Sequence, residues 1–274
     1  MISLFEPFEL PFMQRAALEI VLLAPIAALI GTQIALRGLA FFAHGAGAAT
    51  FPGLVVAGPA GIPAALAGLA TALGFAVAAG RRGRRSQDVP TALALVAALA
   101  IGIVLASDVF GSGSEVDQLL FGSLLAIGDA ELLTSAVVAG VCALAALGLH
   151  RAWLVGGFDP GAERPLGVPG RGAELALYGC IAIAVVAAVD AVGALLVSAI
   201  LVVPAVTALP LARSVRRLQL IAGLIALSEG LAGMLIAFHL DAPPGATIAV
   251  LSGLGFALVV VAPALLASHA RGGG

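Results

Sequence analysis

The sequence predicts an all-α membrane protein that crosses the bilayer several times. Hydrophobic residues make up 61% of the 274 positions and charged residues 10%, with a mean hydropathy of +1.16. Soluble domains carry about 25% charged residues, so this chain has too few to cover a water-exposed surface. Long apolar runs recur along the sequence, and arginines gather in the connections between them. Together these observations indicate a polytopic helical fold.

A run of about 20 apolar residues is long enough to cross the bilayer as a helix. The second apolar run is short and rich in glycine, so an eight-span alternative treats 40–57 as a re-entrant segment. We otherwise expect residues 1–274 to form one transmembrane domain with about nine spans, near 14–36, 40–57, 60–80, 89–107, 132–150, 173–190, 193–210, 217–239 and 245–268.

The arginines predict the orientation of these spans. With nine crossings, every arginine except Arg15 falls on one side, including those of RRGRR (81–85) and RSVRR (213–217). Cytoplasmic loops are enriched in basic residues, so we expect the N-terminus outside and the C-terminus in the cytoplasm. The turn-rich connection at 151–172 is then cytoplasmic, and is either a solvated connector or a docking surface.

Several function classes are excluded or disfavoured. The chain has no lysine, which excludes a P-loop and Schiff-base chemistry, so any ATP must bind to another chain. Cys142 and Cys180 lie inside apolar runs, where cysteine acts as a small buried hydrophobe. An intramembrane serine enzyme is disfavoured because no histidine or lysine lies at a suitable depth beside a candidate serine.

Three ionisable residues inside predicted spans are candidates for a site: His44, Asp190 and Glu229. A charged side chain near the bilayer centre costs about 2.5–3.5 kcal/mol on insertion scales, and such residues usually mark function. Carboxylates with an imidazole suit a cation such as zinc, whereas carboxylates alone suit harder cations. The alternative for each residue is a solvated or hydrogen-bonded side chain with no part in transport.

Prolines inside the spans predict interruptions. Pro204 lies in the middle of ILVVPAVTA, and Pro52–Gly53 lies in the second span. Proline removes a helical hydrogen bond and favours a kink. In membranes such breaks are tolerated where protein or a water-filled cavity satisfies the freed carbonyl groups. These three residues therefore indicate breaks in helices that line a pathway.

Six motifs, in order along nearly the whole chain, resemble the permease subunit of manganese/zinc-type ABC importers, the ABC-3 family. FPGLVVAG is similar to the end of the family segment DALSHAxLPGxA, RRGRRSQDVPTAL to its basic cytoplasmic turn, and DQLLFGSLLAI to LLFGxLLAV. GFDPGAERPLGV resembles the loop FDPEFAxxLGL. VGALLVSAILVVPAVTALPLAR resembles VGxLLVxALLIIPAATAxLLAR, and FHLDAPPGATIAVLSG resembles YYLDxPxGxTIVLxxG.

The resemblance implies a type II importer-like permease in the bacterial cytoplasmic membrane. It implies a second permease copy, a cytoplasmic dimer of ABC ATPases and an external metal-binding protein, but no nucleic acid. Zinc or manganese would be the cargo, with no permanently bound cofactor and with ATP on the partner ATPase. The residues that match the family's ATPase-docking loop are Phe158, Asp159, Pro160, Leu166 and Gly167. The related alternative is a permease for a metal chelate of the siderophore or cobalamin type.

The family's metal motif is altered here. Alignment at Pro52–Gly53 puts His44 where the family has aspartate and Ala48 where it has histidine. The family pair, four residues apart, shares one helical face, and only one polar side chain remains in this sequence. We therefore hypothesise that Glu229 supplies the missing carboxylate in a mixed site with His44, with Asp190 nearby.

Overall fold

A computed structural model describes residues 6–80, 88–109, 120, 122–163, 165–194 and 196–261, and every regular element in these ranges is helical. The all-α prediction is confirmed, whereas the number of crossings and their orientation stay predictions. The basic turn at 81–85 and the end of the last predicted span lie outside the described residues. Six helical segments in the described ranges are long and apolar enough to cross a membrane: Pro11–Arg37, Ala40–Ala60, Asp129–Phe158, Gly170–Val192, Val215–Leu240 and Pro244–Val261. Three shorter apolar helical segments accompany them: Ala64–Ala79, Thr91–Ser107 and Val197–Leu211.

The first span consists of three helical pieces in succession. After a short 3-10 turn at Glu6–Glu9, α1 (Pro11–Ile26) continues into a π-helical turn, η2 (Ala27–Gly31), and then into α2 (Thr32–Arg37). Gly38 ends this span in the left-handed conformation, with φ of 67°. The wide turn follows Pro25, which removes one backbone hydrogen bond inside α1.

The second predicted span is one uninterrupted helix, so the break expected at Pro52–Gly53 is absent. α3 runs over Ala40–Ala60 and includes both residues in helical conformation. The glycine serves packing instead, because a side chain at Gly53 would collide with the backbone oxygen of Ala67 in α4 (Ala64–Gly80). α5 (Asp88–Val104), followed by the π-helical turn η4 (Leu105–Val109), packs against α3 as well.

A long helical hairpin follows the 3-10 turn η6 (Leu124–Ala126). α7 spans Asp129–Phe158 and α8 spans Gly170–Val192, so helix occupies both ends of the connection predicted at 151–172. RAWLVGGF continues α7 through Gly156 and Gly157 as far as the Asp159–Pro160 pair, where the residue preceding proline disfavours helix. Most of α8 is buried: it contacts α3, α4 and α7, and its small side chains allow this close packing.

The span predicted at 193–210 is divided. α9 (Val197–Leu201) ends at Val202, and α10 (Val203–Ala208) begins with Pro204 in its first turn and runs into the 3-10 turn η8 (Leu209–Leu211). The interruption therefore lies at Val202, just before the proline. A proline in the first turn of a helix loses no intrahelical bond, which explains why the new helix starts there.

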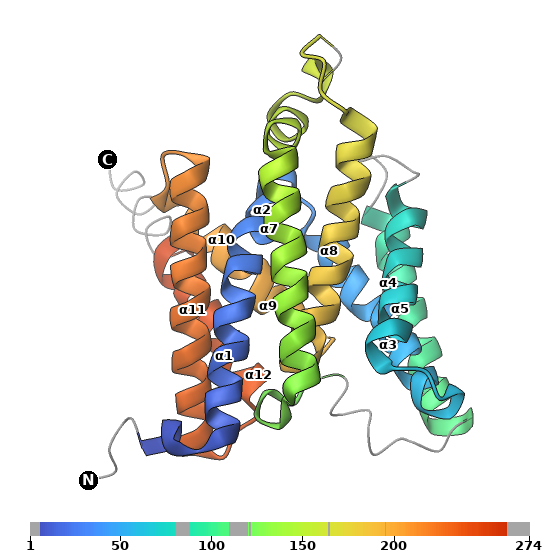
Figure 1. Ribbon diagram of the computed structural model, residues 1–274, viewed down its shortest axis with the longest axis vertical. Helices are drawn as coiled ribbons and strands as arrows, with labels where there is room; N and C mark the ends of the chain where they lie inside the picture. The colour runs from blue at the N-terminus through green and yellow to red at the C-terminus, as the bar shows by residue number, and fades with distance from the viewer. Residues whose placement is uncertain are drawn as a thin grey trace, which may run out of the picture.

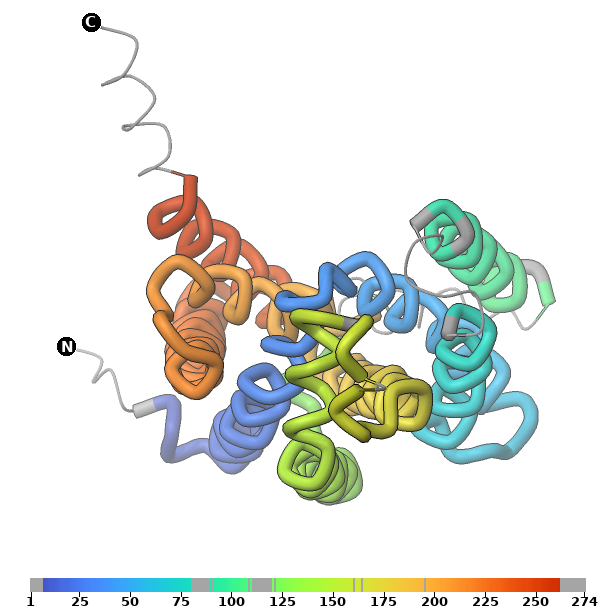
Figure 2. The backbone as a smooth tube through the Cα atoms, turned by 90° about the horizontal axis from the view of Figure 1, so that it is seen from above, coloured from blue at the N-terminus to red at the C-terminus, as the bar shows by residue number. Residues whose placement is uncertain are grey.

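The remaining helices form one side of the molecule. α11 (Val215–Leu240) packs against α1 and against α12 (Pro244–Phe256), which continues into the π-helical turn η9 (Ala257–Val261). Figures 1 and 2 show α11 and α12 on one side of the bundle, α4 and α5 on the other, and α8 between them.

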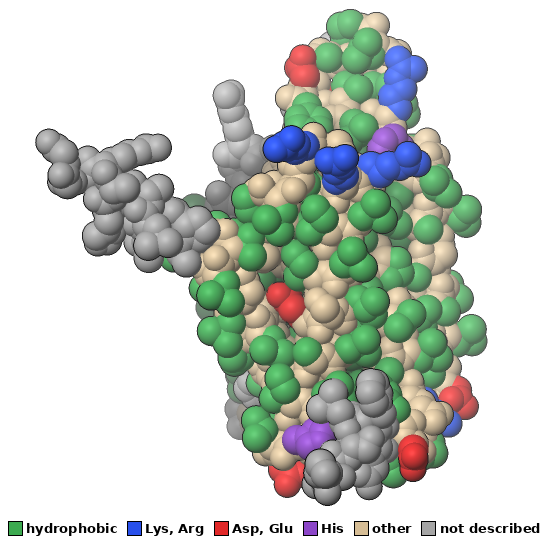
Figure 3. All heavy atoms as spheres, turned by 90° about the vertical axis from the view of Figure 1, so that its left-hand side faces the viewer, with side chains coloured by type: hydrophobic (Ala, Val, Ile, Leu, Met, Phe, Trp, Pro, Cys, Tyr) green, Lys and Arg blue, Asp and Glu red, His purple; other side chains and the backbone are tan. Residues whose placement is uncertain are grey.

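The lateral surface is apolar between two charged ends. Figure 3 shows this on the face that carries α11: basic side chains collect toward the end where α7 meets α8, and most acidic side chains lie at the opposite end. The pattern agrees with the arginine distribution that predicts the orientation, and it places the connection between α7 and α8 at the predicted cytoplasmic end.

Gly31 packs against the backbone of α9, and its replacement should destabilise the fold. A Cβ at this position would collide with the backbone oxygen of Leu201. We expect Gly31→Ala to lower the free energy of unfolding by about 1–3 kcal/mol, as overpacking does. Denaturant unfolding of the purified protein in detergent micelles measures this. Gly74→Ala is the matched control, because nothing lies within 4 Å of the added methyl group; equal losses in both variants would contradict the prediction.

Candidate functional site

His44 lies near the start of α3 and is half-buried. Its Nδ1 atom is buried and has no hydrogen-bond partner within the described part of the chain. The next residue, Gly45, faces α4 and α5, since a Cβ there would lie 2.8 Å from both the Phe75 ring and the Thr91 methyl group. A buried imidazole nitrogen of this kind can accept a proton or bind a metal ion.

Glu229 lies in the middle of α11 and is half-buried. Its Oε2 atom accepts a hydrogen bond from the Ser252 hydroxyl group of α12 at 2.6 Å. The serine satisfies one carboxylate oxygen and ties α11 to α12.

Asp190 lies in the last turn of α8. The segment before α7 packs against this helix end, and the Ser123 backbone N–H donates to the Asp190 backbone oxygen at 3.3 Å. Gly122 and Gly193 both have positive φ, 76° and 82°. Each occupies space that a side chain on the other would need, so their two backbones are in direct contact.

The structure does not assemble the three predicted ligands into one site. Among the residues that it describes, no group of three or more His, Cys, Asp and Glu side chains lies close enough together to hold a metal ion. His44, Asp190 and Glu229 belong to different helices, α3, α8 and α11. A mixed site within one chain therefore stays a hypothesis without geometric support here.

The sequence analysis missed a fourth ionisable residue, Glu19, which is the most deeply buried acid described. It lies in α1 with 1% of its surface exposed, and the Ser135 hydroxyl group of α7 donates to its Oε1 atom at 2.5 Å. Its Oε2 atom is buried with no hydrogen-bond partner in the described ranges. Position alone could have revealed it, because residue 19 falls inside the first predicted span.

The predicted coupling residues lie in and beside the connection from α7 to α8. Phe158 ends α7 with 68% of its surface exposed. The Asp159 carboxylate accepts the Gly161 backbone N–H at 3.1 Å and caps the 3-10 turn η7 (Pro160–Ala162). Leu166 is exposed, and Gly167 turns the chain with φ of 64°. The connection that carries these residues protrudes at one end of the bundle (Figure 1), and it exposes the apolar side chains of Phe158 and Leu166.

Side chains connect this protrusion to the first span. The Arg37 guanidinium group at the end of α2 donates to the Trp153 backbone oxygen at 2.5 Å. A Cβ at Gly156 would lie 2.7 Å from Glu163 Oε1 and 3.5 Å from Arg37 Nη2, so the carboxylate and the guanidinium group approach each other at this glycine. The Trp153 indole N–H donates to the Ala173 oxygen at 2.8 Å. The protrusion, α2, α7 and α8 therefore meet in one polar cluster.

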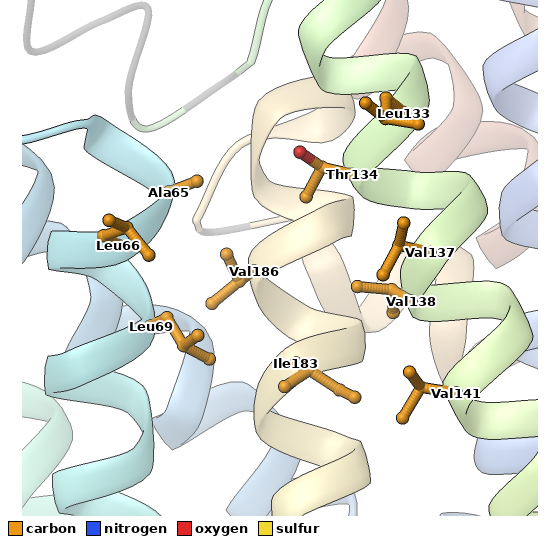
Figure 4. Close-up of a pocket in the computed structure, with 10 residues that line it drawn as sticks. All are labelled: Ala65, Leu66, Leu69, Leu133, Thr134, Val137, Val138, Val141, Ile183 and Val186. Carbon is orange, nitrogen blue, oxygen red and sulfur yellow. The ribbon is translucent and has the colours of Figure 1, made fainter.

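An apolar pocket lies between α4, α7 and α8 (Figure 4). Its volume is about 510 Å³. The one polar side chain in its lining, Thr134, donates to the Ala130 oxygen of its own helix at 2.9 Å. This pocket offers no metal ligand, since it is lined by Ala65, Leu66, Leu69, Leu133, Thr134, Val137, Val138, Val141, Ile183 and Val186.

Comparison with known protein families gives one match over nearly the whole chain. Residues 9–263 match the model of the ABC 3 transport family. The chain belongs to this family. With its long apolar helices, membership identifies a membrane permease of the ABC transport class and a multi-pass cell-membrane protein, as the sequence predicts.

Curated relatives of this ABC 3 member differ in the cargo that they are named for. The chain is 29% identical to the chelated iron transport system membrane protein YfeD of Yersinia pestis, over 93% of this chain and 87% of the relative. It is also 29% identical to the manganese transport system membrane protein MntC of Halalkalibacterium halodurans, over 90% of this chain and 86% of the relative.

Solved structures confirm the fold of the ABC 3 member. The structure of PsaBC from Streptococcus pneumoniae in complex with Fab matches with a TM-score of 0.82 and 21% identity, over 92% of both chains. An inward-facing conformation of a putative metal-chelate type ABC transporter matches with a TM-score of 0.72 and 16% identity, over 90% of this chain and 85% of the other.

Removal of the hydroxyl group that bonds Glu19 should destabilise the bundle. Ser135 is buried, with 1% of its surface exposed, and Ser135→Ala leaves both oxygens of a buried carboxylate without a hydrogen bond. We expect a loss of about 1–3 kcal/mol in the free energy of unfolding, measured in detergent micelles. Thr134→Ala is the neighbouring control: its hydroxyl bond is exposed, so its loss should be clearly smaller. Similar losses in the two variants would contradict the role of the Glu19–Ser135 bond.

Proposed function

We propose that the chain is the membrane-spanning subunit of an ATP-driven importer of divalent metal ions, manganese or zinc. An external binding protein would deliver the metal, and a cytoplasmic dimer of ABC ATPases would drive two copies of the permease between outward-open and inward-open states. ATP hydrolysis would belong to the partner ATPase, since a chain without lysine cannot form the P-loop lysine contact.

The observation that carries the metal assignment is the His44 side chain. Its buried Nδ1 atom has no protein partner among the described residues, and it lies in the α3 segment that resembles the metal motif of this family. Two relatives of the chain are named for metal transport, one for manganese and one for chelated iron. We infer that His44 contacts the metal during transport and that Glu229 adds a carboxylate on the same route.

We further propose that the protrusion formed by Phe158, Asp159, Pro160, Leu166 and Gly167 is the coupling segment. An exposed apolar side chain at the end of a helix suits a groove on a partner protein. Movement of this segment would reach the first span through the contacts around Arg37 and Trp153. Because α2 is followed directly by α3, the same movement would reach His44.

A metal chelate is the second candidate cargo. One relative is named for chelated iron, and one structural match is titled as a metal-chelate type transporter. A chelate would need a wider cavity and fewer ligating side chains than a bare ion. Competition between free Mn²⁺, free Zn²⁺ and ferric siderophores for uptake separates the two candidates.

Transport should depend on His44 and Glu229. In proteoliposomes that contain the permease, its ATPase and its binding protein, we expect ATP-dependent uptake of radioactive manganese or zinc. His44→Ala and Glu229→Gln should each lower that uptake at least about tenfold, the scale of losses at metal sites.

His239→Ala is the control for the uptake measurement. His239 is exposed at the end of α11 and contacts the Leu235 oxygen of its own helix, so uptake should not change. If the wild-type complex takes up neither metal, the proposed function is wrong. If uptake occurs but both His44→Ala and Glu229→Gln retain it, these residues are not on the metal route.

The coupling segment makes a separate prediction. Phe158→Ala should weaken binding of the permease to its ATPase roughly tenfold or more, because burial of a large apolar side chain contributes about 1.5–3 kcal/mol. Co-purification and ATPase stimulation in lipid nanodiscs measure the effect. Leu144→Ala is the matched control on the same helix, since Leu144 is 72% exposed but lies in the middle of α7. Equal ATPase binding by the two variants would exclude the proposed contact at Phe158.

A further inference from the structure

Glu19 has a buried carboxyl oxygen that no group in the described ranges satisfies. Its side chain is 1% exposed, with Oε1 bonded to Ser135 and Oε2 buried without a hydrogen-bond partner in the described ranges. Residue 19 is the ninth of α1, so it lies roughly 12 Å along the helix from its start. Burial of an unpaired carboxylate costs free energy. A ligand on the Oε2 atom of Glu19 would remove this cost.

The neighbouring charges increase the need for a cation. Asp190 of α8 and Glu131 of α7 both act on Glu19 electrostatically, and Glu131 also acts on Asp190. The nearby Arg15 belongs to the same helix, but its guanidinium group pairs with the exposed Asp129 at 3.2 Å. Acidic groups near a buried carboxyl group disfavour its ionised form, so the cluster favours a bound cation or a bound proton.

The surrounding helices give the cluster a fixed position. α1, η6, α7 and α8 meet at the end of the bundle that is predicted to be external. Contact of Gly122 with Gly193 and the Ser123 bond to the backbone of Asp190 hold the segment before η6 against the end of α8. Asp190 is only half-buried, so solvent can reach the cluster of Glu19, Asp190 and Glu131 from the side of Asp190.

We propose that Glu19 and Asp190 form a carboxylate site for a divalent cation near the external end, separate from His44. Oxygen ligands alone favour hard cations such as Mn²⁺, and small hard cations are commonly held by one or two carboxylates with water completing the shell. Glu131 strengthens the negative potential, although its own Oε2 atom accepts the Gly128 N–H at 3.0 Å. The choice of Mn²⁺ rests on the proposed function, and it makes this site the first contact of the metal with the membrane subunit.

The test measures Mn²⁺ binding by electron paramagnetic resonance, with the full-length chain in lipid nanodiscs. All samples carry His44→Ala and Glu229→Gln, so that the ligands proposed above are absent. We expect this background to bind Mn²⁺. Adding Glu19→Gln or Asp190→Asn should weaken that binding at least about tenfold. Gln retains the acceptor for the Ser135 hydroxyl group, so Glu19→Gln preserves the observed hydrogen bond.

Asp241→Asn is the matched control, since it removes an exposed carboxylate at the predicted external end, just after α11, and should leave Mn²⁺ binding unchanged. An absence of Mn²⁺ binding in the background chain, or binding that Glu19→Gln leaves unchanged, would overturn the site and favour a proton on Glu19. If Glu19→Gln lowers the unfolding temperature too far for measurement, Asp190→Asn replaces it in the test. Weaker Mn²⁺ binding by that variant then supports the site, and unchanged binding overturns it. The uptake assay is independent of this readout, so failure of either proposal can be recognised separately.

Discussion

Helices surrounded by hydrocarbon gain little from burial of apolar surface, so small residues and polar pairs decide which helices meet. The bundle shows both means of association. Two glutamate–serine hydrogen bonds each join a helix pair: Glu19 with Ser135 joins α1 to α7, and Glu229 with Ser252 joins α11 to α12. Close backbone approaches supply the rest of the packing, as at Gly53 against α4. Each of the two glutamates thus joins two helices through a hydrogen bond. A carboxylate oxygen that makes no such bond can bind a cation.

The two ends of the bundle suit different tasks. At the predicted cytoplasmic end, Arg37 and Glu163 approach each other beside Gly156, and Arg37 bonds to the Trp153 oxygen, so side-chain contacts join the connection between α7 and α8 to the first span. At the opposite end, Glu19 is buried in α1 with its hydroxyl partner on α7, and Asp190 lies in the last turn of α8. Arginines at one end and acids at the other give the transporter a polarity along its long axis (Figure 3).

Composition was enough to predict an all-helical membrane fold, because the chain lacks the charges that a soluble surface needs. Local interruptions were harder to predict. Pro204 and Pro52 look alike in sequence, yet the chain breaks before the first and not at the second, because close packing of α3 against α4 holds that helix continuous. The ligand set could not be predicted either: depth identifies His44 and Glu229 singly, but helix packing decides which residues become neighbours. Glu19 obeyed the same depth rule and was overlooked.

The backbone contact between Gly122 and Gly193 restricts how this chain can vary. Each residue has a positive φ, and each lacks the side chain that would expel the other segment. The two positions consequently behave as one unit: a side chain at either displaces the connection before η6, whatever stands at the other. Variation that alters the cluster around Asp190 must therefore occur in the side chains and not in the path of the backbone.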